Sequence, residues 1–140
     1  MAKPPRPWTV TPHGPIEKLE DNLWAVEGAV PVPGGIRRRM CIVKLQNGDL
    51  LFFHAVPLAE PQLAEVKAWG RPATLVVAHD NHAIDAVAFA AKLGLQVYAP
   101  RAGEAGLRAR QVPLAGGLEQ VPTSSFPATG PWSKQTRPAP

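Results

Sequence analysis

Three of the four histidines in this sequence directly follow or end apolar segments, and they are the residues best suited to chemistry. His54 ends the apolar segment 50–54, and His79 and His82 follow the apolar run 73–78. In open α/β sheets, ligands bind beyond the C-terminal ends of the strands. Imidazole nitrogens with carboxylates nearby are suitable donors for zinc or iron. We therefore predict a metal site formed by His54, His79 and His82.

Asp80 and Asn81 lie between the two loop histidines, and Asp85 follows closely. We name Asp80 and Asn81 as candidate catalytic residues, with Asp80 also an alternative third ligand for one zinc or iron ion. The same loop can instead cap the next helix without any metal, because Asp and Asn side-chain oxygens accept hydrogen bonds from free helix amides. Both interpretations stay open. No Ser-His-Asp or Cys-His spacing and no phosphate-binding glycine loop is present.

A β-hairpin and an earlier strand are expected in the first half of the chain. Residues 22–30, 39–46 and 50–54 have the composition of strands, and Asn47-Gly48-Asp49 supplies a tight turn between the last two. The apolar spacing of Leu63, Val66 and Trp69 then predicts a short helix that begins near Pro61 and ends at Gly70.

The second half of the pattern predicts a strand over 73–78, a helix and a strand over 95–99. The helix is indicated by apolar residues at helical spacing and by Gly94 at its end. A strand, a hairpin and two helix-strand units in this order predict an α/β fold with a mixed sheet covered by helices.

The two ends of the chain are rich in proline. Of the 17 prolines, five fall in residues 1–15 and six in residues 101–140. Because proline lacks a backbone donor, we expect a leader over 1–15 and a core over 16–100. The region 101–140 is expected to hold short edge strands, at 111–114 and 118–121, and a disordered tail.

The charge of the chain and its remaining polar residues indicate which kinds of partner and location to expect. The net charge is +4, but the densest basic run, Arg37-Arg38-Arg39, has no interleaved aromatic residues and is typical of a solvated strand flank. We therefore expect no nucleic-acid partner. The lone Cys41 is expected to be a small buried residue, and His13 is expected to be exposed and without a role. No membrane-spanning run is present, and a cytoplasmic location is expected.

The hairpin, the helix and the apolar strand that runs into a histidine-rich loop together resemble the metallo-β-lactamase superfamily. That family's loop reads His-x-His-x-Asp-His, and a gap-free count from 97–99 places it on residues 77–82. His79 and His82 are then retained, Val77 stands at the first histidine, and Asn81 stands at the aspartate. A register that begins at His79 retains fewer ligands.

The stretch 39–45, the turn at 48–50 and Pro57-Leu58 also look like a divergent branch of the superfamily, and the resemblance covers about residues 16–100. It implies the N-terminal half of an αββα sandwich, with helices on one side of a mixed sheet. It also implies a metallohydrolase-like activity on a small-molecule substrate.

The sequence departs from the family in its later ligands, because it has no histidine after His82 and no aspartate after Asp85. An incomplete metal site follows from the resemblance, and the residual ligand set argues against full activity as a metal-dependent hydrolase. The alternative is a non-catalytic half-fold that acts through association. One sheet face of a half-sandwich lacks its partner layer, and a homodimer would cover it.

Overall fold

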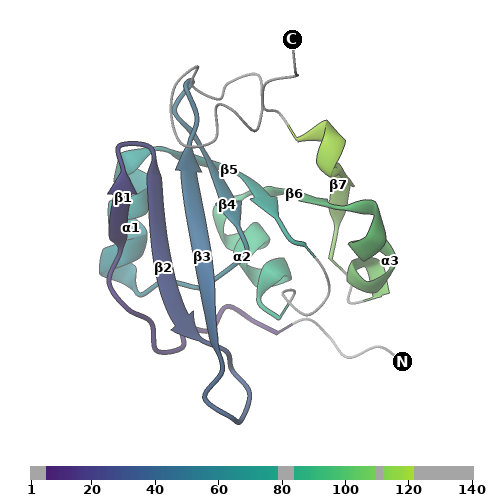
Figure 1. Cartoon of the computed structure of the whole chain (residues 1–140), viewed down its shortest axis with the longest axis horizontal. Coiled ribbons are helices and arrows are strands. Elements are labelled where there is room, and N and C mark those ends of the chain that lie inside the picture. Colours follow the sequence, from purple (N-terminus) through teal and green to yellow (C-terminus); the bar gives the residue numbers. More distant parts are fainter. Residues whose placement is uncertain (1–5, 79–83, 110–111, 122–140) are drawn as a thin grey trace.

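The computed structural model describes residues 6–78, 84–109 and 112–121. Seven strands form one mixed sheet, in which every strand lies beside its neighbours in the sequence (Figure 1). The strands are β1 (Glu17–Glu20), β2 (Leu23–Ala29), β3 (Arg37–Lys44), β4 (Asp49–Phe53), β5 (Arg71–Val76), β6 (Gln96–Ala99) and β7 (Leu114–Gly117). The helices are α1 (Glu60–Trp69), α2 (Ala86–Leu93) and α3 (Arg101–Ala109), and a 3-10 turn covers Leu118–Gln120.

The sheet is antiparallel from β1 to β4 and parallel from β4 to β7. The expected hairpin is confirmed. Asn47 accepts a hydrogen bond from the Asp49 amide through its side-chain oxygen, and Gly48 has a φ of 91°, a left-handed conformation that glycine adopts at little cost. The expected α/β fold with a mixed sheet and helices is therefore present.

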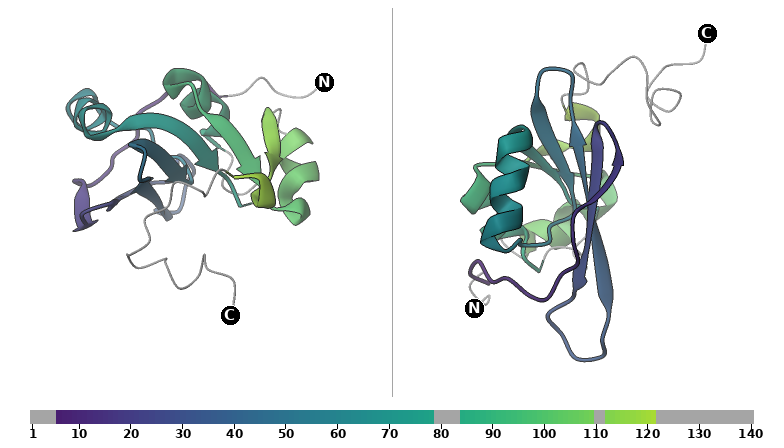
Figure 2. Two further views of the ribbon diagram at one scale, coloured as in Figure 1. Left: turned by 90° about the horizontal axis from the view of Figure 1, so that it is seen from above. Right: turned by 90° about the vertical axis from the view of Figure 1, so that its left-hand side faces the viewer.

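The three helices pack on one face of the sheet and contribute to a single hydrophobic core. Each parallel strand pair is joined through a helix, and right-handed crossovers that always step in the same direction place their helices on the same face. Figure 2 shows α1 and α2 on one side of the sheet, with α3 beside β7. The largest fully buried side chains include Phe52 of β4, Phe89 of α2 and Leu107 of α3, all in a single cluster.

Two elements differ from the sequence-based expectation near the C-terminal end. Residues 101–109 form α3, which the sequence analysis missed, and its Gly103 and Leu107, four residues apart, are buried. The expected edge strands at 111–114 and 118–121 are wrong in position. The strand is Leu114–Gly117, because Pro113 cannot donate to the ladder and pairing with β6 starts at Leu114.

The antiparallel edge and the start of α2 also differ from expectation. The strand β1 was not expected, since all four of its residues are exposed and give no buried pattern. Helix α2 begins after Asp85, so the residue expected to cap it at position 80 or 81 is not its N-cap. Among the described residues, no helix has the length and apolar character required to cross a membrane.

Gly70 lets the end of α1 lie against the β3–β4 turn. A Cβ at this position would lie 2.6 Å from Leu50 Cδ2 and 2.7 Å from the carbonyl oxygen of Gly48. We predict that Gly70→Ala lowers the free energy of unfolding by about 1–3 kcal/mol through overpacking. Urea unfolding followed by circular dichroism measures this change.

The matched control is Gly14→Ala, where the nearest atom to the added Cβ would be 3.6 Å away, an ordinary contact. An equal, small effect of both substitutions would contradict the close packing at Gly70.

Candidate functional site

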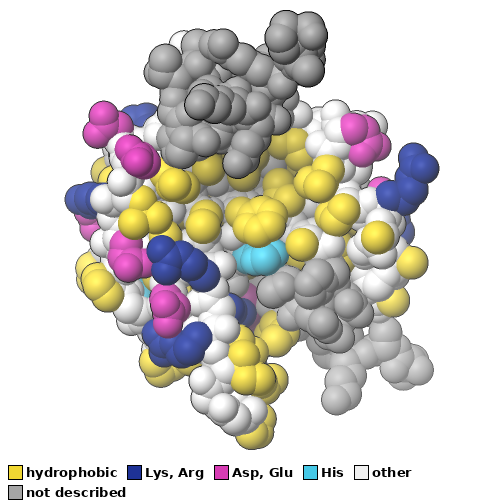
Figure 3. Space-filling view, in the orientation of Figure 1, with side chains coloured by type: hydrophobic (Ala, Val, Ile, Leu, Met, Phe, Trp, Pro, Cys, Tyr) yellow, Lys and Arg dark blue, Asp and Glu magenta, His cyan; other side chains and the backbone are white. Residues whose placement is uncertain are grey.

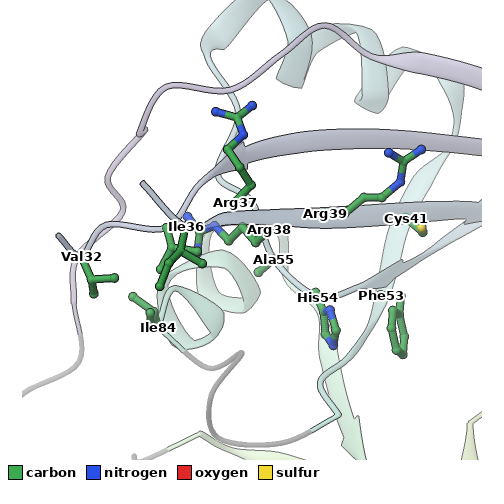
Figure 4. Close-up of a pocket in the computed structure, with 11 residues that line it drawn as sticks. Val32, Ile36, Arg37, Arg38, Arg39, Cys41, Phe53, His54, Ala55 and Ile84 are labelled. Carbon is green, nitrogen blue, oxygen red and sulfur yellow. The ribbon is translucent and has the colours of Figure 1, made fainter. Parts of the chain in front are cut away.

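A pocket of about 760 Å³ lies at the edge of the sheet where β4 ends and β3 begins (Figure 4). The β2–β3 loop and Ile84 lie at one end of the pocket, and Phe53 and His54, around the end of β4, lie at the other. A volume of this size is typical of small-molecule sites. The lining residues are Val30, Val32, Ile36, Arg37, Arg38, Arg39, Cys41, Phe53, His54, Ala55 and Ile84.

His54 lies on the pocket wall immediately after β4. Its amide donates a hydrogen bond of 2.9 Å to the carbonyl oxygen of Val76, which ties the end of β4 to the end of β5. Its φ of 67° makes it the one non-glycine residue in the described part of the chain with a left-handed backbone. Its ring lies 4.2 Å from that of Phe53, between centroids. Strained backbone of this kind clusters at functional sites, so it motivates a functional hypothesis for His54.

The remaining predicted site residues, His79, Asp80, Asn81 and His82, lie outside the described residues. In the part of the chain that is described, no group of three His, Cys, Asp or Glu side chains is placed to hold a metal ion. The metal site therefore stays a prediction, with His54 as its one described member. Val77, which stands at the family's first histidine, is fully buried in the main core and carries no ligand atom.

Asp85 joins three parts of the chain, and it contacts the pocket-lining residue Arg38. Its side chain is 0% exposed, and its Oδ2 accepts a 2.7 Å hydrogen bond from Arg38 Nη2. Its Oδ1 lies 3.3 Å from Arg6 Nε as an ion pair, although the geometry does not make a hydrogen bond. The carboxylate thus fixes the start of α2 to β3 and to the N-terminal segment, in place of capping the helix.

The three consecutive arginines at positions 37–39 lie in two different environments. Arg37 and Arg39 are half-exposed and form ion pairs with Glu27, and Arg39 also pairs with Glu17. They fit the expected solvated flank. Arg38 does not, because strand alternation places it on the face of Met40 and Ile42, where only 12% of its side chain is exposed.

The expectation that Cys41 is buried in the core is wrong. Cys41 is half-buried on the face of β3 opposite the core and lines the pocket, since strand alternation gives the core positions to its neighbours Met40 and Ile42.

The expectation that His13 is exposed and without a role is also wrong. His13 is half-buried and forms hydrogen bonds. Its Nε2 accepts a 2.9 Å hydrogen bond from the Ala59 amide, and its Nδ1 lies 2.9 Å from the Gly14 carbonyl oxygen.

The sheet face opposite the helices carries a second, smaller apolar group, which we call the outer face. Leu51, Val76 and Val121 are buried there, with Val43 and Tyr98 packed against them. Phe53 on the same side is 41% exposed. Figure 3 shows hydrophobic side chains gathered over the middle of this face around a histidine.

No protein-family model matches the sequence, and no curated protein matches it. Solved structures do match. DIM-1 metallo-β-lactamase superimposes with a TM-score of 0.61 at 17% identity, over 79% of this chain and 53% of that one. A metallo-β-lactamase from Hirschia baltica gives a TM-score of 0.53 at 20% identity, over 77% and 52%. FIM-1 from Pseudomonas aeruginosa, solved in a mono-zinc form, gives 0.54 at 16%, over 78% and 51%.

The chain therefore has the fold of half of a metallo-β-lactamase, and the resemblance seen in the sequence is confirmed at the level of the fold. It spans about half the length of the solved structures it matches.

Sequence reasoning missed most of the pocket. Its apolar wall includes Val30, the last residue of the expected strand 22–30, and Val32 and Ile36, which follow it, and nothing in their spacing indicated a pocket. The Arg38–Asp85 pair joins residues 47 positions apart, and no local pattern signals it. The available signal was the placement of Arg38 in register with two core residues of its strand.

Asp85 is predicted to be the costliest polar residue to remove. Asp85→Ala leaves the guanidinium of Arg38 buried without its carboxylate, and the loss of one partner of a buried pair costs about 3–5 kcal/mol. The comparison is Glu27→Ala, which breaks half-exposed pairs worth less than about 1 kcal/mol. Chemical denaturation measures both. Similar losses for the two variants would show that the Asp85 pair is not buried as described.

Proposed function

We propose that the chain is a divergent metallo-β-lactamase-fold protein with a metallohydrolase-like site, which binds one zinc or iron ion through His54, His79 and His82. The observation that carries the proposal is the position of His54. It follows β4 in a left-handed conformation, is tied to the end of β5 and lines a pocket. The ends of β4 and β5 lie at the same edge of the sheet, and His79 and His82 follow β5 in the sequence.

The donor chemistry supports a single ion. Three imidazoles with one open position form a common catalytic zinc set, and Asp80 is an alternative ligand within the same loop. Asp85 does not belong to the set, because two guanidinium groups already engage its carboxylate. A bound ion of this kind supplies Lewis acidity for hydrolysis.

The chain's own residues would shape the rest of the reaction. The pocket beside His54 offers apolar walls that bind a small-molecule substrate and exclude bulk water. Asp80 and Asn81 are the residues proposed to interact with the reacting groups, since they lie in sequence between the two loop histidines.

Metal content tests this proposal. We expect about one zinc or iron ion per chain in the wild type, as measured by elemental analysis, because three imidazoles suffice for a catalytic site. The ion is expected to be lost in the His79→Ala/His82→Ala double variant and in His54→Gly. Glycine at position 54 accepts the left-handed backbone, so this variant removes the imidazole without adding strain.

His13→Asn is the matched control, because His13 is the one histidine outside the proposed set, and it is engaged by the Ala59 amide. It should keep the ion. A wild type without metal, or variants that bind as much as the wild type, would contradict the proposal.

A second candidate function is association through the outer face. Val43 and Tyr98 are half-buried and Phe53 is 41% exposed, and they leave apolar surface on the side of the sheet opposite the three described helices. Sheets are stable when both faces are covered. A second copy of this chain offers the same apolar surface, and a two-fold pairing of the faces would cover both at once.

The mass in solution tests this alternative. With metal removed by a chelator, sedimentation should give a dimer for the wild type and a monomer for Val43→Lys/Tyr98→Lys, because charge on the outer face opposes its burial. Leu19→Lys, at an exposed position of β1, should leave the dimer intact. A monomeric wild type would exclude a homodimer of this kind.

A further inference from the structure

The pocket has apolar walls on opposite sides. Val32 and Ile36 of the β2–β3 loop and Ile84 before α2 lie near one another in the close-up, and Phe53 lines the pocket farther along the sheet (Figure 4). Ile36 is 56% exposed, although an apolar residue of this size is more often buried. An apolar group bound between these side chains would remove their surface from water, and such burial stabilises a complex by roughly 25 cal/mol per Å².

The polar lining of the pocket is cationic. Three arginines and a histidine are among the described residues that line it, and none of those described residues carries a carboxylate. Arg37 and Arg39 have half-exposed glutamate partners outside the pocket, and such pairs are weak and screened by salt. The arginine best shielded from water is Arg38.

Arg38 belongs to a cluster of charges that is not balanced within the described residues. The guanidinium groups of Arg6 and Arg38 share the single carboxylate of Asp85, so this part of the cluster has one positive charge in excess. The Nε atom of Arg38 is buried and has no hydrogen-bond partner within the described residues. A buried donor without an acceptor costs about 1–3 kcal/mol, so an incoming anionic oxygen would be favoured here.

We propose that this pocket binds an organic acid with an apolar body and a single carboxylate. The apolar walls hold the body, and the excess positive charge at Arg38 attracts the carboxylate. A carboxylate fits better than a phosphate monoester, because it carries one negative charge and a phosphate carries about 1.5 to 2. The proposal goes beyond the metal site, since the binding needs no metal and His54 is the one described lining residue that the two sites share.

Octanoate and octan-1-ol are the probes, because they have the same chain length and differ in charge. Both are titrated into the full 140-residue chain after treatment with a chelator, and binding is measured by calorimetry. A charge-assisted hydrogen bond is expected to make octanoate bind about 10-fold more tightly than octan-1-ol. Because the protein is metal-free, the result is independent of whether the histidines bind zinc.

Two substitutions at Ile36 separate charge from apolar contact. Ile36→Glu and Ile36→Lys remove the same apolar side chain from an exposed loop position of the pocket wall and introduce opposite charges. We expect Ile36→Glu to weaken octanoate binding about 10-fold relative to Ile36→Lys. Leu19→Glu places the same charge on β1, outside the pocket, and should leave octanoate binding unchanged.

Tighter binding of octanoate than octan-1-ol, together with weaker octanoate binding by Ile36→Glu than by Ile36→Lys, supports the proposal. Absence of octanoate binding overturns it. Equal affinity for the two probes, or equal effects of the glutamate and the lysine, would show an apolar cavity without acid recognition and would also overturn it.

Discussion

The direction of the crossovers is the constraint on which the rest of the structure depends. From β4 to β7 each connection steps to the next strand on the same side, and each contains a helix. Right-handed crossovers then collect all helices on one face, where they build the main core. The same constraint leaves the apolar outer face without any of the three described helices and places the C-terminal ends of β4 and β5 at one edge of the sheet.

The candidate site lies at the edge of the sheet where β4 and β5 end, and two physical features favour a site there. Residues that follow a strand are not held to its extended conformation, so a left-handed residue such as His54 is tolerated there. The buried Asp85 fixes the start of α2 to the pocket-lining Arg38 of β3, and within the described residues its two arginine partners leave one positive charge in excess. Stability and ligand attraction are therefore properties of the same charge cluster.

The sequence was sufficient for the elements with strong local signals. The Asn47–Asp49 turn, the helical spacing before Gly70 and the apolar run of β5 all correspond to observed elements. Helix α3 was missed because Gly103 and Gly106 have low helix propensity, although the buried pair Gly103 and Leu107 has helical spacing. The Arg38–Asp85 pair and the pocket were inaccessible to local patterns, because they join segments far apart in the chain. His79 and His82, which the sequence favours most strongly as ligands, remain predictions.

The most direct test of the account is to locate the metal-binding edge by nuclear magnetic resonance. Zinc is titrated into isotope-labelled protein that has been treated with a chelator, and the backbone amide shifts are followed. The account predicts that the largest changes fall on residues at the ends of β4 and β5 and on Ile84, with His54 among them, while the amides around His13 stay constant. Changes centred on His13, or no change near His54, would contradict a metal site at this edge of the sheet.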